Sequence, residues 1–230
     1  RALRLCVEKK PLGILFLGGN RDHFLADFDK IQIPSVLVTN DAAKFPFPNL
    51  CSVASDDLLA SHLAIDHLAA LGHRKIVVIG GDQETSDTTR MRYLGCAEAF
   101  QHHGISFDEA LDYETVRYSF AGGYRAVEQL LARNREFTAL FAMSDVMAMG
   151  AIRALRDAGK RVPEDVSVVG FDGLAIGEYT VPRLSTIRQD VAQLAARSLE
   201  LLQANISGQH LRCYETVPVT LDWKESARKI

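Results

Sequence analysis

Short apolar runs recur along the chain, and none of them alternates with polar residues. Five such runs lie at residues 12–17, 35–38, 75–79, 139–143 and 166–169. A strand that is covered on both faces has apolar side chains at successive positions, whereas a half-exposed strand alternates. These runs therefore predict strands inside a sheet that is covered on both sides.

Stretches with helical periodicity separate most of these runs. Leu59, Leu63, either His67 or Leu68, and Leu71 repeat at intervals of about three or four residues. Ser55 or Asp56 could cap the start of this helix, and Gly72 follows where it would end. Similar apolar stripes predict helices over residues 121–131, 145–158 and 191–206. Parallel strands need a crossover that a helix usually supplies, so alternating strands and helices indicate the α/β class with parallel sheets.

Composition narrows the class of protein. The chain has 230 residues, enough for one large domain or two α/β lobes, and 47% of them are hydrophobic. Its 26 Lys and Arg are spread among 29 Asp and Glu, giving a net charge of -3, so we expect no DNA binding by these residues alone. No apolar run reaches the length of a membrane span, so we expect no membrane association.

The four cysteines, Cys6, Cys51, Cys96 and Cys213, lie far apart without a CxxC or Cys/His metal spacing. They are typical of buried thiols in a reducing compartment, which predicts a cytoplasmic protein. The first residues contain neither an initiator methionine nor the apolar segment of a signal peptide. We therefore expect the chain to be a piece of a longer protein.

Small or polar residues follow every predicted strand. They are Gly18 to Asn20, Thr39 to Asp41, Gly80 to Asp82, Ser144 and Asp145, and Phe171 to Gly173. Ligands of open α/β sheets bind at the carboxyl ends of the strands, so this pattern indicates a site for a polar small molecule. Each position taken alone also fits a helix cap or a turn, and only the five together favour a binding site.

The sequence contains no pattern typical of catalysis, of a phosphate loop or of a metal site. GxSxG, HExxH, GxxxxGK[ST] and GxGxxG are all missing. His62 and His67 are five residues apart, which places them on different faces of a helix, and His102 and His103 suit a helix C-terminus. We therefore expect no catalytic residue, no metal and no cofactor, and we expect a protein that is not an enzyme.

Six motifs occur in an order and spacing that resemble the effector-binding core of LacI/GalR-type transcriptional regulators. They are LAALGHRKIVVIGG (68–81), RMRYLG (90–95), GGYRAVEQLL (122–131), SDVMAMGAIRAL (144–155), VPEDVSVVGFDG (162–173) and LSTIRQD (184–190). The stretch VTLDWKES (219–226) resembles the closing strand of that family.

This resemblance implies two Rossmann-like lobes of the periplasmic binding protein type I fold, with a ligand in the cleft between them. By analogy, one lobe comprises residues 1–73 and 190–213, and the other comprises residues 74–189 and 214–230. Family members open with a strand, a helix and a second strand before the position of Leu12, and those elements are missing from this sequence, as is a helix-turn-helix domain.

The resemblance also implies the ligand contacts. Arg92 matches an arginine that makes paired hydrogen bonds to ligand hydroxyls or a carboxylate, and Asp172 matches a carboxylate of the cleft. The further candidates are Ser144, Tyr118, Gln189, Asp56 and Thr88. From the residues alone, Arg92 also fits an ion pair, Asp172 a turn and Asp56 a helix cap. In a water-filled cleft, removal of Arg92 or Asp172 would weaken ligand binding and leave stability nearly unchanged.

The function implied is that of the effector-sensing domain of a bacterial repressor. It would bind a small polar effector, a sugar or a derivative, and would act on operator DNA through a helix-turn-helix domain outside this chain. We expect a homodimer through the predicted helix 145–158 and residues 178–182, because Met147, Met149, Tyr179 and Val181 are too apolar for a solvated face. The alternative is a periplasmic sugar-binding protein of a transporter, and a hydrolase or sugar-modifying enzyme lacks a nucleophile or an acid/base pair.

Overall fold

The computed structural model describes residues 2–19 and 21–230, so Asn20, one of the residues that follow the strands, lies outside the described part. The chain divides into two compact units, each with its own sheet. Unit 1 comprises Arg1–Asp56, Thr85–Thr88 and Asp190–Pro218, and unit 2 comprises Asp57–Glu84, Thr89–Gln189 and Val219–Ile230. Within the described ranges, no helix is both long and apolar enough to traverse a bilayer.

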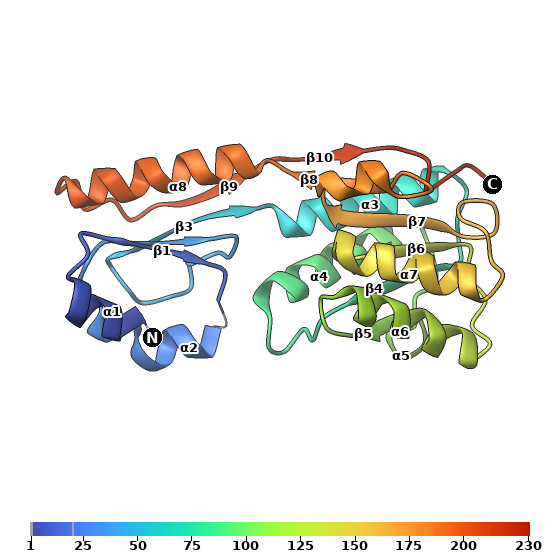
Figure 1. Ribbon diagram of the computed structural model, residues 1–230, viewed down its shortest axis with the longest axis horizontal. Coiled ribbons are helices and arrows are strands. Elements are labelled where there is room, and N and C mark those ends of the chain that lie inside the picture. Colours follow the sequence, from blue (N-terminus) through green and yellow to red (C-terminus); the bar gives the residue numbers. More distant parts are fainter. Residues whose placement is uncertain (1, 20) are drawn as a thin grey trace. The chain divides into compact units, whose positions relative to one another are not determined.

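Unit 1 is built on four parallel strands in the order β1-β2-β3-β9. Their bounds are β1 Ile14–Leu17, β2 Ser35–Val38, β3 Leu50–Ser55 and β9 Tyr214–Val217. Helix α8 (Val191–Ile206) covers one face of this sheet. The other face carries α1 (Ala2–Lys9), α2 (Arg21–Asp27) and the short 3-10 helix η1 (Phe28–Lys30), as Figure 1 shows.

The two faces of this sheet explain why β2 has three successive apolar residues, Val36 to Val38. Val36 and Val38 belong to an apolar cluster with Leu194 of α8, whereas Leu37 belongs to a separate cluster with Phe28. Successive side chains of a strand point to opposite faces, so a strand covered on both sides needs an apolar residue at each step.

Unit 2 is built on six strands in the order β10-β8-β7-β6-β4-β5. Their bounds are β4 Ile76–Gly80, β5 Tyr113–Thr115, β6 Ala139–Ala142, β7 Ser167–Asp172, β8 Ser185–Gln189 and β10 Val219–Asp222. All neighbouring pairs are parallel except β10 and β8. The predicted α/β class with parallel sheets is confirmed, with one antiparallel edge strand added.

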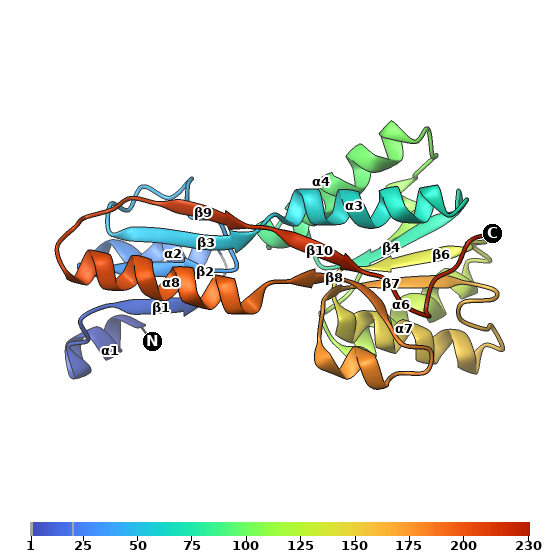
Figure 2. The same cartoon turned by 90° about the horizontal axis from the view of Figure 1, so that it is seen from above.

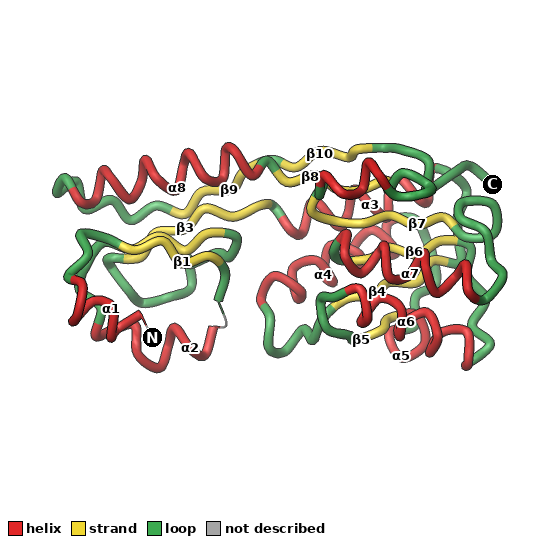
Figure 3. The backbone as a smooth tube through the Cα atoms, in the orientation of Figure 1, coloured by secondary structure: helices red, strands yellow, loops and turns green. Residues whose placement is uncertain are grey.

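The helices of unit 2 lie on both faces of its sheet, as Figure 2 shows, and the backbone tube of Figure 3 traces the crossovers. One face carries α3 (Asp57–Ala70) and α4 (Asp87–His102), and the other carries α6 (Phe120–Ala132) and α7 (Asp145–Asp157). Two short elements, α5 (Glu109–Asp112) and the 3-10 helix η2 (Ala175–Tyr179), complete the unit. The helices predicted over 121–131, 145–158 and 191–206 are present as α6, α7 and α8.

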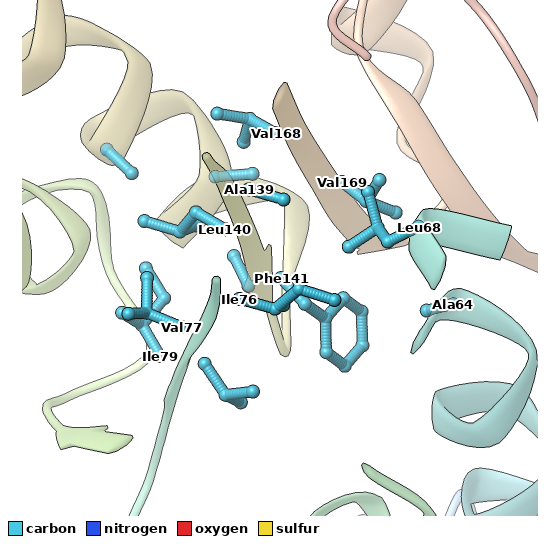
Figure 4. Packing of buried hydrophobic residues seen from close by; sticks show 14 of the residues in the cluster. Ala64, Leu68, Ile76, Val77, Ile79, Ala139, Leu140, Phe141, Val168 and Val169 are labelled. Carbon is cyan, nitrogen blue, oxygen red and sulfur yellow. The ribbon is translucent and has the colours of Figure 1, made fainter. Parts of the chain in front are cut away.

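The core of unit 2 repeats the two-faced packing of unit 1. In Figure 4, Phe141 and Val169 point toward Leu68 of α3, whereas Leu140 and Val168 point to the opposite side of the sheet. All five side chains are fully buried. At roughly 25 cal/mol per Å² of apolar surface, full burial of side chains of this size stabilises the fold by about 1.5–3 kcal/mol each.

Two glycines allow α6 and α7 to pack closely. A Cβ at Gly123 would lie 2.0 Å from the carbonyl oxygen of Met147, and one at Gly150 would lie 2.0 Å from that of Phe120. No real Cβ approaches an oxygen so closely, so larger residues would force the helices apart. The start of α6, where Tyr118 precedes the helix, is thereby held against α7.

The division into units differs from the predicted one at two of the three crossings. The sequence analysis expected crossings near residues 73, 190 and 213, and the structure has one of them between Gln189 and Asp190. In the structure the chain enters unit 2 at Asp57, because α3 packs against β6, β8 and β10 of the second sheet. It leaves unit 1 after Pro218, because β9 pairs with β3 in the first sheet.

Candidate ligand-binding site

The polar residues of unit 2 gather where its parallel strands end. Arg92 comes from α4, Asp57 from the first position of α3, Asp172 from the end of β7, and Gln189 from the end of β8. Tyr118 lies in the segment between β5 and α6. The carboxyl ends of parallel strands meet at one edge of a sheet, so the topology assembles residues that are up to 132 positions apart, Asp57 and Gln189.

Arg92 is the most enclosed charged group of this edge. Its side chain is 7% exposed. Its Nε donates to Asp57 Oδ1 at 2.8 Å, and its Nη1 donates to the carbonyl oxygen of Met143 at 2.5 Å. The guanidinium carbon lies 3.5 Å from the centre of the Phe171 ring, a cation–π contact that fixes the plane of the group.

The pattern of bonds leaves part of the guanidinium available. Arginine has five N–H donors, and Nη2 donates no hydrogen bond to any of the residues in 2–19 and 21–230. Burial lowers the pKa of Arg92, but the charges of Asp57, Tyr118 and Asp172 outweigh it, so the pKa lies above its ordinary value. Arg92 is thus a charged donor in a fixed position, and the N–H groups of its Nη2 remain available to a ligand.

Asp172 has an unusual backbone and an unusual acidity. Its φ is 120°, a value outside the regions that non-glycine residues favour, and such strain persists only where surrounding contacts impose it. Its Oδ1 accepts a hydrogen bond from Gln189 Nε2 at 2.8 Å. Burial, with a smaller contribution from the charge of Asp145, raises the pKa of Asp172 to about 6 although Arg92 opposes it.

Asp145 fixes the turn that follows Asp172. Its Oδ1 accepts from the hydroxyl of Thr186 at 2.6 Å, and its Oδ2 accepts from the backbone N–H of Leu174 at 2.6 Å. Burial raises the pKa of this carboxyl, and the hydrogen bonds from Thr186 and Leu174 oppose the rise. The hydrogen bond from Leu174 to Asp145 therefore fixes the chain two residues after the strained backbone of Asp172.

Tyr118 presents an aromatic face beside these charges. Its ring is 41% exposed, and its hydroxyl lies 3.0 Å from the hydroxyl of Thr89. A Cβ at Gly81 would lie 2.7 Å from the Tyr118 ring, so only glycine there allows the ring its position. Burial of the hydroxyl raises the pKa of Tyr118, which keeps it a neutral hydrogen-bonding group.

The structure brings together four of the seven residues predicted for the site: Arg92, Asp172, Gln189 and Tyr118. Ser144 is 3% exposed, and its hydroxyl accepts from the backbone N–H of Met147, so it caps α7. Asp56 and Thr88 belong to unit 1.

The expectation that Arg92 lies in a water-filled cleft is wrong. It is buried against Asp57, and neither side chain is more than 9% exposed. Loss of Arg92 would deprive this buried carboxylate of the cation that pairs with it at 2.8 Å, which is costly.

Three residues of this edge were missed by the sequence analysis: Asp57, Thr89 and Phe171. Asp57 and Thr89 directly follow the predicted Asp56 and Thr88, and Phe171 precedes Asp172. The spacing contained a signal for one of them, since Thr89 and Arg92 are three residues apart and share a helical face. The sequence analysis counted Phe171 only among the residues that follow a predicted strand, and nothing in the sequence indicates that its ring packs against Arg92.

A family model described as a periplasmic binding protein-like domain matches residues 65–227 of the chain. The chain belongs to this family. DegA, an HTH-type transcriptional regulator of Bacillus subtilis strain 168, is 35% identical over 193 residues, which cover 82% of this chain and 56% of DegA. The chain spans between 56% and 60% of the length of the first curated relatives it matches.

Solved structures give the same result. A LacI family transcriptional regulator of Enterococcus faecium with bound ribose is 26% identical with a TM-score of 0.87, and the match covers 100% of this chain and 84% of that one. The lac repressor dimer, bound to operator and an anti-inducer, is 25% identical with a TM-score of 0.85, and the match covers 99% and 77%. The resemblance to LacI/GalR-type effector-binding domains is confirmed.

Proposed function

We propose that this chain is the effector-sensing part of a LacI-type transcriptional repressor, and that it binds a sugar or a sugar derivative through Arg92 and Asp172. The observation that carries the proposal is the fixed guanidinium of Arg92, whose Nη2 has no acceptor in the described chain, beside a carboxylate held in a strained backbone. Donor and acceptor groups side by side match the hydroxyl groups of a sugar, which donate and accept together. The ribose bound to the E. faecium relative supports this choice.

The charges of the site favour a neutral ligand. Arg92 carries one positive charge, which Asp57 already pairs with at 2.8 Å, and Asp172 adds a carboxylate whose pKa of about 6 leaves it mostly ionised at neutral pH. The three groups together are therefore net negative above pH 6. A phosphate or carboxylate on the ligand would meet this excess negative charge, so we propose a neutral polyhydroxylated effector.

Titration calorimetry against a panel tests this. The panel contains neutral mono- and disaccharides, nucleosides and phosphosugars, and the expected result is saturable binding of one neutral member at one site per chain. Binding of a phosphosugar alone would overturn the charge argument and leave the site in place. Binding of a sugar that Arg92→Lys and Asp172→Asn both leave unchanged would overturn the site.

The effector would act by shifting the balance between arrangements of the protein, by no more than its difference in affinity for them. Operator binding is proposed to need a helix-turn-helix part outside these 230 residues, since the net charge of -3 gives them no surface that follows phosphates. A gel-shift titration at low salt should show no retardation by this chain. Sequence-specific retardation would place the DNA-reading surface inside it.

A homodimer is proposed through the segment 178–182 and the neighbouring exposed apolar residues. Tyr179 is 85% exposed and Val181 is 84% exposed, and Ile176 of the adjoining 3-10 helix is 52% exposed. Met147, which the sequence analysis counted with this surface, is fully buried in the core of unit 2 and cannot contribute. Light scattering should give twice the mass of the chain, and Tyr179→Glu should halve it. A monomeric parent would contradict the proposal.

We also propose that the protein works in the cytoplasm. All four cysteines are unpaired, and Cys51 and Cys96 are buried, as expected for thiols in a reducing compartment. Burial keeps the pKa of the Cys96 thiol far above its usual range, so this group is an inert core residue.

A further inference from the structure

Four side chains with metal-binding groups meet on the outer surface of α3 and α4. His62 and Asp66 come from α3, His102 is the last residue of α4, and His103 follows it. The ligand atoms of His62, Asp66 and His102 all lie within 4.8 Å of one another. This cluster lies outside the proposed sugar site, whose residues on the same helices are Asp57 and Arg92.

The packing of the two helices creates this cluster. His62 and Asp66 are four residues apart and share one face of α3. A Cβ at Gly95 of α4 would lie 2.1 Å from the carbonyl oxygen of Leu58, so glycine there lets the two backbones approach closely (Figure 2). The end of α4 is thereby brought over His62, and the ring centres of His62 and His102 lie 6.0 Å apart.

The distances resemble those around a bound ion. His62 Nε2 lies 3.4 Å from Asp66 Oδ2, which is long for a hydrogen bond from a ring N–H. Two ligand atoms on a tetrahedral zinc ion, each at about 2.0–2.1 Å from the metal, are about 3.3 Å apart. The pair is therefore already at the separation that a shared ion requires.

His103 supports the same reading. Its Nε2 lies 2.7 Å from the other oxygen of Asp66, Oδ1. This contact orients the carboxylate and leaves Oδ2 directed toward His62, as in the hydrogen-bonded carboxylates that surround metal sites. His102 is exposed, so its ring can rotate to bind an ion without disturbing the packed core.

We propose that His62, Asp66 and His102 bind a divalent transition metal ion of the zinc class, with His103 orienting Asp66 and water completing the coordination. Imidazole nitrogens with one carboxylate are typical of Zn²⁺, and also accept Co²⁺, Ni²⁺ and Cu²⁺, whereas Mg²⁺ and Ca²⁺ prefer all-oxygen sites. The ion would tie α3 to α4, the two helices that carry Asp57 and Arg92.

The sequence analysis expected no metal site because it compared histidines along one helix. His62 and His67 are indeed on different faces, and His67 packs edge-on against Trp223 with a ring separation of 4.0 Å. The ligands that matter come from two helices whose contributing residues are 36 positions apart, from Asp66 to His102. Only the packing at Gly95 unites them.

The test uses Zn²⁺ and Co²⁺ alone, without sugar, so its outcome is independent of the proposed function. Calorimetry with Zn²⁺ should show one ion per chain, and Co²⁺ should give the visible absorption of a tetrahedral site. His62→Ala, Asp66→Ala and His102→Ala should each weaken binding at least tenfold. Zn²⁺ should also raise the melting temperature of the parent, because an ion that binds only the folded state stabilises it.

Two control variants keep the test decisive. His210→Ala removes an exposed histidine of unit 1 and should leave Zn²⁺ binding unchanged. Cys6→Ser combined with Cys213→Ser removes the two partly exposed thiols and should also leave it unchanged. Because His102 is exposed, His102→Ala should melt like the parent in the absence of metal. The proposal is overturned if Zn²⁺ does not bind saturably, or if binding survives loss of both His62 and His102, or if it depends on the cysteines.

Discussion

The two edges of the sheet in unit 2 each hold a carboxylate near an arginine, and the protein satisfies the two carboxylates to different extents. At the amino ends of β5 and β6, Asp112 is 3% exposed and accepts from Arg135 at 2.6 Å and from the backbone N–H of Asp108 at 2.9 Å. At the carboxyl ends, Asp172 has a strained backbone and a pKa raised to about 6 by burial, and Arg92 keeps Nη2 without an acceptor in the described chain.

We propose that this difference separates a structural ion pair from a ligand-binding site. At the amino edge, Arg135 and the backbone N–H of Asp108 satisfy both oxygens of Asp112, so this carboxylate gains nothing from a ligand. The carboxyl edge leaves donors and a costly carboxylate that a ligand would satisfy. Selection for stability alone would eliminate a strained backbone and an unfavourably buried carboxylate. Where such features persist, they are typical of functional positions.

The largest effect is expected at Arg92. Arg92→Met removes the cation that pairs with the buried carboxylate of Asp57 at 2.8 Å, so we expect a loss of about 3–5 kcal/mol in the free energy of unfolding and loss of sugar binding. Urea denaturation measures the first and calorimetry the second. The double variant with Asp57→Asn should recover part of the stability and none of the binding. A parent-like unfolding curve for Arg92→Met would show that the pair is not buried in solution.

Asp112→Asn tests the other edge. It removes a charged acceptor from Arg135, whose side chain is 37% exposed and stays partly hydrated. We expect a loss of about 2 kcal/mol in stability and an unchanged sugar affinity. A fall in affinity with this variant would contradict the assignment of the amino edge to structure alone.

Asp172→Asn should change stability in the opposite direction. The folded pKa of Asp172, about 6, lies above its ordinary value of 3.8, so the folded state binds the proton more tightly than the unfolded state does. This carboxyl therefore favours folding most below pH 4, and that contribution is lost as the pH rises through 6. At pH 7.5 we expect Asp172→Asn to be more stable than the parent by about 1–2 kcal/mol, with the difference vanishing near pH 4.

A gain at pH 7.5 that is the same at pH 4 would show that the substitution acts through something other than the charge. Denaturation curves at the two values of pH distinguish these outcomes. Asparagine suits this position as a control, since it keeps the shape of the side chain and tolerates positive φ better than most residues.

The smallest effect is expected at Tyr118. Its ring is 41% exposed and is proposed to stack on the ligand, so Tyr118→Ala should weaken sugar binding by about 1 kcal/mol, roughly fivefold. Tyr118→Phe should bind nearly as well as the parent, because the hydroxyl lies 3.0 Å from Thr89 within the protein. Equal losses in the two variants would assign the effect to the hydroxyl and not to the ring.

Sequence reasoning predicted more of the fold than of the site, and the residues show why. Apolar runs and helical stripes depend on neighbours a few positions apart, so they locate β2, α6, α7 and α8 directly. The ion pair of Asp57 with Arg92 depends on how α3 and α4 approach each other, which the close contact at Gly95 decides. Motif matching pointed to Arg92 and Asp172 as candidate ligand contacts, but it named Asp56 as a further candidate and not Asp57.

The distinction between a solvated and a buried Arg92 also lay beyond the sequence. An arginine in a sequence gives no sign of whether its side chain is solvated or buried. The contacts of Arg92 with the ring of Phe171 and the carbonyl oxygen of Met143 show in the structure that it is enclosed. The same holds for Ser144, whose role as a cap of α7 is decided by backbone geometry.

The most direct test of the proposed site is the pH dependence of sugar binding, measured by calorimetry between pH 5 and 8 for the parent and for Asp172→Asn. If the ionised Asp172 accepts ligand hydroxyls, parent affinity should fall by up to about tenfold per pH unit below about pH 6. Asp172→Asn should bind about 30-fold more weakly at pH 7.5 and show no such dependence. An affinity that is independent of pH in the parent and unchanged in the variant would contradict the central claim that the carboxyl edge of unit 2 binds the effector.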